Sequence, residues 1–247
     1  MKQTRARGRG RRPWRRLAVA LVVVAASTGL FSSAGVSAAQ SGPPAASYAY
    51  DVTGSSRAGL GPFVFSVAVP STARLSVSYA RDCGVLVTTT KSSSETGVYC
   101  PSSTAALALY SSVQTMTVVM WHQSTTTTCS TPADMVRDGA VAGDSWPTSC
   151  GVRTDGLDNS TFQADGTVTY VGPETLTIGG ESVSAFHGRS DVTFTGERTG
   201  SMVEDLWLDA NGLPLKRSVN QKTVGAHKST VFGMDYTATL RSLTPVG

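Results

Sequence analysis

Four cysteines are the residues whose spacing says most about chemistry. Cys83, Cys100, Cys129 and Cys150 are 17, 29 and 21 positions apart, whereas structural zinc ligands come in closely spaced C-x2-C pairs. An even number of cysteines in an oxidising compartment is typical of disulfides. Three pairings are open. We favour the neighbours, Cys83–Cys100 and Cys129–Cys150, because each closes a short loop and would stabilise the fold by about 3 kcal/mol through the reduced entropy of the unfolded chain.

The other residue types that carry catalysis or bind metals are scattered. His122, His187 and His227 are isolated in the sequence, so no local spacing predicts a metal site. Serine is abundant, but no G-x-S-x-G motif occurs, and a nucleophile elbow would need a helix after the strand. We therefore expect no catalytic residues, no metal, no cofactor and no enzymatic activity.

Three carboxylates near the C-terminus are close enough to suggest a paired acid–base site. Glu204 and Asp205 are consecutive, so on a strand their side chains point to opposite faces. Asp209 begins residues 209–212 (DANG), which lack the third oxygen ligand and the terminal glutamate of a calcium loop. This segment predicts a tight hairpin turn instead.

The N-terminus has the organisation of a secretion signal. Residues 1–16 contain eight Lys and Arg and no acid, an apolar run of 14 residues follows at 17–30, and small residues fill most of 32–39. A membrane-spanning helix needs about 20 residues, so we expect residues 1–39 to be a cleaved signal peptide. Arginine pairs at 11–12 and 15–16 leave both general secretory and twin-arginine export open. We expect a secreted or cell-envelope protein with no membrane span after cleavage.

Removing the leader reverses the sign of the net charge. The full chain has 21 basic and 17 acidic residues, a charge of +4, and eight of the basic residues lie in residues 1–16. The remainder has 13 basic against 17 acidic residues, a charge of −4. Nucleic-acid-binding domains carry basic patches, so the composition excludes nucleic acid as a partner. Nothing in the sequence specifies a protein partner.

Hydrophobic alternation with period two, which is typical of strands, begins after a short Pro-containing segment. Residues 40–47 are expected to be a disordered lead-in, and residues 48–247 a single mostly β domain with an internal boundary near 124–151. That boundary follows from a polar run and from residues 131–134 (TPAD), which have the cap and first-turn residues of a short helix. Strands are expected in the first half at 48–53, 63–69, 74–80, 84–90, 105–110 and 113–123.

The second half alternates more regularly. Strands are expected at 167–171, 175–178, 182–188, 191–195, 201–208, 213–221, 230–232 and 234–243, with turns at 165–166, 179–180 and 211–212. Apolar residues fall on one face and mostly Thr, Ser and charged residues on the other. The expected fold class is all-β with very little helix: an antiparallel meander that forms a half-barrel or a closed, barrel-like sheet.

Three short segments resemble known envelope proteins. Residues 205–209 (DLWLD) and 211–217 (NGLPLKR) resemble a hairpin of the LolA-like and LppX-like envelope carriers, and residues 143–146 (GDSW) resemble a feature of related secreted domains. The resemblance covers residues 140–243. It implies an incomplete antiparallel barrel whose concave apolar face accepts acyl chains of a lipid or lipoprotein. Family members also have helices over that face, whereas this sequence predicts almost none.

The apolar face of the meander needs a cover, and the nature of that cover decides the function. We expect an exported, non-enzymatic protein that binds or carries an apolar ligand such as a lipid or acyl chain. The side chains expected to line the site are Phe194, Leu206, Leu208, Leu213, Leu215 and Tyr236. The alternative is a secreted structural or adhesion-type envelope protein, in which the first-half strands close a packed core without a ligand.

Overall fold

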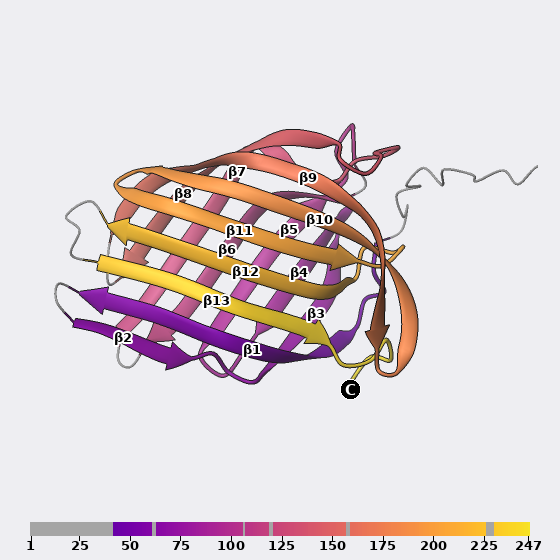
Figure 1. Ribbon diagram of the computed structural model, residues 1–247, viewed down its shortest axis with the longest axis horizontal. Helices are drawn as coiled ribbons and strands as arrows, with labels where there is room; N and C mark the ends of the chain where they lie inside the picture. The colour runs from indigo at the N-terminus through magenta and orange to yellow at the C-terminus, as the bar shows by residue number, and fades with distance from the viewer. Residues whose placement is uncertain (1–41, 61–62, 106, 119–120, 157–158, 226–229) are drawn as a thin grey trace, which may run out of the picture. The chain divides into compact units, whose positions relative to one another are not determined.

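A computed structural model describes residues 42–247 except 61–62, 106, 119–120, 157–158 and 226–229. The expected signal peptide lies outside the described residues. These residues form 13 strands, shown in Figure 1. The strands are β1 (Ser47–Leu60), β2 (Phe63–Ala68), β3 (Thr72–Ala80), β4 (Cys83–Thr89), β5 (Ser93–Cys100), β6 (Leu107–Val118), β7 (Trp121–Val136), β8 (Ser145–Gly156), β9 (Ser160–Ile178), β10 (Glu181–Gly196), β11 (Arg198–Leu208), β12 (Pro214–Gly225) and β13 (Thr230–Leu240). Within the described residues there is no helix long and apolar enough to cross a membrane.

The strands form one antiparallel sheet that closes on itself. They follow one another in chain order from β13 back to β3, then β1 and β2, and β1 also pairs with β13. One edge of β1 pairs with β13, while its other edge pairs first with β3 and then with β2. Twelve strands therefore make a closed barrel, and β2 is an additional strand beside β1 (Figure 1). The all-β antiparallel class is confirmed, in its closed form rather than the incomplete barrel that the family resemblance implied.

Several expected interruptions are absent because the strands are longer than the alternation predicts. The predictions of a turn at 165–166 and of a helical turn at 131–134 are wrong. Strand β9 runs through the first segment, and β7 runs through the second. Two separate strands were expected within each of the ranges 167–178, 182–195 and 230–243, but each pair is part of a single strand, β9, β10 or β13. Strand β5 was not expected at all. Register shifts in the β6–β7 pairing, between Leu107 and Ala108 and between Leu109 and Ser111, change the phase of the alternation. A continuous strand with such a bulge resembles two short strands in sequence.

Both disulfides join neighbouring strands. Cys83–Cys100 links the start of β4 to the end of β5, and Cys129–Cys150 links directly paired residues of β7 and β8. The expected pairing of neighbours is confirmed. Disulfides are typical of proteins outside the cytoplasm. The second disulfide lies in the region 124–151, where β7 and β8 belong to the same sheet as the rest of the barrel.

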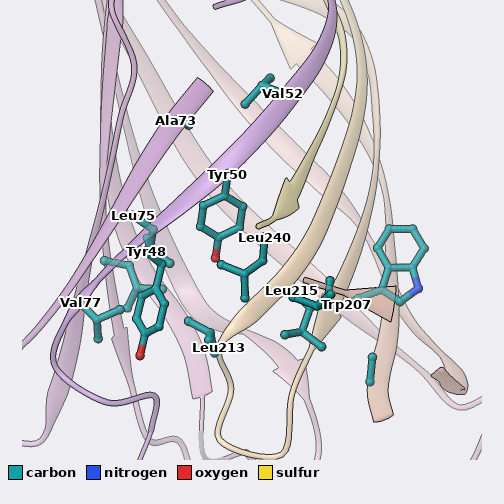
Figure 2. Close-up of a cluster of buried hydrophobic side chains, with 13 residues drawn as sticks. Tyr48, Tyr50, Val52, Ala73, Leu75, Val77, Trp207, Leu213, Leu215 and Leu240 are labelled. Atoms are coloured by element: carbon teal, nitrogen blue, oxygen red, sulfur yellow. The ribbon is translucent and has the colours of Figure 1, made fainter. Parts of the chain in front are cut away.

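One end of the barrel is filled by a hydrophobic cluster, which we call the closed-end cluster. Figure 2 shows its side chains gathering from β1, β3, β12 and β13, with Trp207 of β11 to one side. Its buried members are Tyr48, Tyr50, Val52, Ala73, Leu75, Val77, Leu86, Ile178, Ala185, Trp207, Leu213, Leu215 and Leu240. Residues 42–46, expected within the disordered lead-in, also lie at this end: Ala46 packs against the cluster, and its carbonyl accepts a hydrogen bond from Val77 N at 2.8 Å.

The tip of the β9–β10 hairpin packs against the closed-end cluster. In Figure 1 the joined ends of these strands curve past the ends of β12 and β13. The bend coincides with a register shift between His187 and Gly188 and with Gly172, whose φ of 135° lies in the region that favours glycine. At the turn, a Cβ on Gly179 would lie 3.0 Å from the carbonyl oxygen of Arg241, so the tip lies directly against the chain after β13.

Candidate functional site

A cavity of about 370 Å³ occupies the barrel lumen and is lined by residues from all twelve barrel strands. This participation follows from strand geometry, because every second side chain of each strand faces the inside of a barrel. Small-molecule sites typically have volumes of about 300–1,000 Å³. The lumen is therefore large enough to hold a small molecule.

One part of the lumen is apolar. We call Val152, Phe162, Val192, Phe194 and Met202 the apolar wall; they come from β8 to β11 and all line the cavity. The rings of Phe162 and Phe194 meet edge to face, with centroids 5.6 Å apart and planes at 88°, the arrangement that aromatic pairs favour. The apolar wall offers a surface suited to a hydrocarbon chain.

A second part of the lumen is polar and uncharged. On β6 and β7 the residues that line the cavity include Ser112, Gln114, Gln123, Thr125 and Thr127. Ligand sites commonly combine an apolar lining with a few polar groups that fix orientation. The lumen accordingly suits an amphiphile better than a pure hydrocarbon.

An ion-pair cluster crosses the lumen, and we call Glu95, Glu204 and Arg217 the Arg217 cluster. Arg217 on β12 donates from Nε to Glu204 Oε1 at 2.7 Å and from Nη1 to Glu95 Oε2 at 2.9 Å. Glu95 is on β5, which four strands separate from β12 by the shorter route round the barrel. The two side chains together span roughly the 10 Å that separates packed sheets. The Arg217 cluster therefore ties two facing walls together.

Burial and neighbouring charges shift the pKa values of several groups in this part of the lumen. Burial alone would lower the pKa of the Arg217 guanidinium, but the carboxylates of Glu204 and Glu95 outweigh it and hold the pKa well above its ordinary value. Burial and the same carboxylates raise the pKa of Tyr236 to about 12, although Arg217 opposes them. The pKa of Tyr99 is likewise raised, mainly by burial. At neutral pH the guanidinium is charged and both phenols are neutral.

The structure divides the six residues expected to line a ligand site. Phe194, Leu206, Leu208 and Tyr236 line the cavity. Leu213 and Leu215 are instead buried in the closed-end cluster, 3% and 0% exposed, because the β11–β12 turn places them at the filled end of the barrel. A role in binding for the first four stays a prediction.

A second polar group, which we call the hinge cluster, lies where the β9–β10 hairpin bends. His187 contacts Glu174 Oε1 through Nδ1 at 2.7 Å and Asp205 Oδ1 through Nε2 at 2.9 Å. Its ring stacks on Trp207, with centroids 4.2 Å apart, and Trp207 Nε1 donates to Glu174 Oε2 at 2.8 Å. None of these four residues lines the cavity. The hinge cluster holds the hairpin to β11 and gives no sign of a role in binding.

The three neighbouring carboxylates of the sequence are separated in the structure, and the described residues hold no group of three or more His, Cys, Asp or Glu side chains that could bind a metal ion. Glu204 faces the lumen whereas Asp205 belongs to the hinge cluster, as expected for consecutive strand residues. Asp209 Oδ1 accepts backbone hydrogen bonds from Asn211 and Leu213, both at 2.8 Å, which stabilises the expected hairpin turn. His122 is exposed beside Thr117, and His227 lies outside the described residues.

Glu174 makes the stability of the hairpin depend on pH. The hydrogen bond from Trp207 lowers the pKa of Glu174 below its ordinary value of 4.5; burial opposes this and His187 assists it. A carboxyl with a lowered folded-state pKa stabilises the fold fully above pH 4.5, and this stabilisation is lost as the pH falls through the lowered value. Glu174→Gln should therefore lower the free energy of unfolding at pH 7 by under about 1 kcal/mol, because the side chain is 43% exposed. Urea midpoints at pH 7 and at strongly acidic pH measure the effect.

The matched control is Glu181→Gln, which removes an exposed carboxylate from the same hairpin. It should leave the midpoint unchanged at either pH. A Glu174→Gln deficit that is the same at acidic and neutral pH would contradict the expected role of the ionised carboxylate.

Comparisons with known proteins give one remote structural likeness. No protein-family model matches the sequence, and no curated protein matches it significantly. Among solved structures, the chain is similar to the hypothetical lipoprotein YmcC from Escherichia coli K12, with a TM-score of 0.33 and 12% sequence identity, over 80% of this chain and 90% of that one. A TM-score this low carries no argument about function, which must come from the lumen itself.

Proposed function

We propose that this protein is an exported, non-enzymatic carrier that binds an apolar ligand, such as a lipid or acyl chain, in the barrel lumen. The observation that carries the proposal is the cavity with its apolar wall. Protein interiors are packed as densely as organic crystals and contain few voids larger than a water molecule. A cavity of about 370 Å³ beside two phenylalanines is costly for folding alone and is explained by a ligand.

The structural or adhesion-type alternative has less support from the same observation. Barrels of about eight strands fill their interior with their own side chains, and wider barrels enclose space. Here twelve strands surround the lumen, and the closed-end cluster fills only one end. A protein that served only as a rigid scaffold would gain stability by filling the remainder.

Native mass spectrometry tests the proposal. The full chain, with its own leader, is expressed in a bacterial host and recovered from outside the cytoplasm, and the intact mass is compared before and after organic extraction. We expect an additional mass of lipid size in the native protein. Phe194→Arg should abolish it, because a guanidinium in the apolar wall cannot be buried there without a partner.

Val113→Arg is the matched control for that variant. Val113 lies on β6 with its side chain on the outer face, where the residue is 42% exposed, so the same chemical change leaves the lumen intact. Both variants must keep the circular dichroism and the two disulfides of the wild type. A wild-type protein that carries no ligand and takes up no added lipid would refute the carrier and favour the structural alternative.

A further inference from the structure

Charge is unevenly distributed inside the lumen. Among the described residues that line the cavity, four carry a formal charge: Glu95, Glu204, Arg217 and Arg198. The first three are in direct contact as the Arg217 cluster, with separations of 2.7 and 2.9 Å. Two carboxylates share one guanidinium, so one negative charge is in excess at this depth of the barrel.

Arg198 does not neutralise this excess. It lies six residues before Glu204 on β11, which corresponds to roughly 20 Å at about 3.3 Å per residue, and it has interactions of its own. Coulomb energy falls with distance. A cation this far away contributes far less than one in contact with the carboxylates.

Both carboxylates are accessible from the cavity. The side chains of Glu95 and Glu204 are 23% and 14% exposed, and both residues line the lumen. Arg217 binds Oε2 of Glu95 and Oε1 of Glu204, whereas an ionised carboxylate can accept hydrogen bonds at both of its oxygens. Tyr99 and Tyr236 lie near enough to interact electrostatically with Arg217, and they also line the cavity. Aromatic faces attract cations, so the two carboxylates and the two rings suit a positively charged donor on the side of the carboxylates that Arg217 leaves free.

Building on the proposed function, we propose that the lumen selects apolar molecules that carry one cationic nitrogen, such as an alkyl ammonium. The nitrogen binds beside Glu95 and Glu204 and compensates the excess negative charge. The hydrocarbon extends from there along Met202, the lumen-facing residue of β11 next to Glu204, towards Phe194. A carboxylate head group meets like charge at this position, and a hydroxyl forms only the weaker, uncharged hydrogen bond.

Three probes with the same tail test the selectivity: dodecylammonium, 1-dodecanol and dodecanoate. Each displaces diphenylhexatriene, a neutral fluorescent hydrocarbon, from the delipidated protein at pH 7 and below micelle-forming concentrations. We expect dodecylammonium to bind at least about ten-fold more tightly than dodecanoate, equivalent to about 1.4 kcal/mol, with dodecanol between them. Glu95→Gln and Glu204→Gln each remove the excess charge while keeping the side-chain shape, and each should abolish most of this preference.

Glu181→Gln controls for the general attraction of an acidic protein for cations. It changes the net charge by the same amount but lies exposed in the β9–β10 hairpin, so it should keep the wild-type preference. If it loses the preference as Glu204→Gln does, the selectivity comes from the overall charge and the inference is overturned.

The outcomes separate this inference from the proposed function. Equal binding of the three probes, or tighter binding of dodecanoate, would overturn the selectivity and leave the carrier intact. If neither diphenylhexatriene nor any probe binds, both are overturned. The comparison of probes on the unsubstituted protein decides the matter even if a variant fails to fold.

Discussion

Replacing Arg217 with methionine should lower the free energy of unfolding by about 3 kcal/mol at neutral pH. Removing one partner of a buried ion pair costs about 3–5 kcal/mol, because the remaining charge is left without compensation, and here two carboxylates remain. We expect the lower end of that range, since Glu95 and Glu204 keep some exposure to the lumen. Urea unfolding followed by circular dichroism measures the change.

Two further variants show whether charge is the cause. Arg153→Met breaks an ion pair with Asp155 whose side chains are 70% and 50% exposed, and such surface pairs contribute under about 1 kcal/mol. Combining Glu95→Gln and Glu204→Gln with Arg217→Met removes the whole group of charges and should recover most of the lost stability. An Arg217→Met loss no larger than that of Arg153→Met would show that the Arg217 cluster does not hold the walls together.

The Arg217 cluster also explains why part of the site could not be predicted from sequence. Period-two analysis looks for apolar residues on the buried face, but the β5 residues that line the lumen are Ser93, Glu95, Gly97 and Tyr99. Their polarity conceals the strand, and with it Glu95. Arg217 and Glu95 are 122 residues apart, so no local pattern indicates that they meet.

Glycine and proline led to wrong predictions of turns for a different physical reason. Gly166 lies inside β9, where a Cβ would be 2.2 Å from the carbonyl oxygen of Asp191. The glycine is therefore needed for the close approach of β10, not for a turn. Pro132 follows a register shift in β7, and bulges are among the positions where a sheet tolerates proline. Residues that usually end strands here mark bends in continuous barrel strands.

Features with local causes were predictable. The disulfides join neighbours along the chain, and the 209–212 turn depends on a single side chain, that of Asp209. Closure of the barrel depends instead on β1 pairing with β13, for example Tyr50 with Leu240. Nothing in either strand alone specifies that partner, so both an open and a closed sheet were compatible with the sequence.

Replacing Ile178 with aspartate should detach the tip of the β9–β10 hairpin from the barrel. Ile178 is 2% exposed in the closed-end cluster, where Leu176 and Val183 pack beside it. An unpaired carboxylate buried there would cost several kcal/mol. Releasing the tip forfeits the burial of a few apolar side chains, at about 1.5–3 kcal/mol for each one fully buried. The two costs are similar, so we expect stability to fall by about 4 kcal/mol, with the tip exposed in much of the population.

Hydrogen exchange resolved by segment distinguishes local release from general unfolding. Amides of residues 173–187 should lose protection in Ile178→Asp while those of β12 and β13 keep it, because the barrel strands are paired independently of the tip. Thr177→Asp is the control, since it places the same charge one residue away on the exposed face. Its effect should stay within about 0.5 kcal/mol. If Ile178→Asp instead lowers protection uniformly round the barrel, the tip is an integral part of the core and not a separable cover.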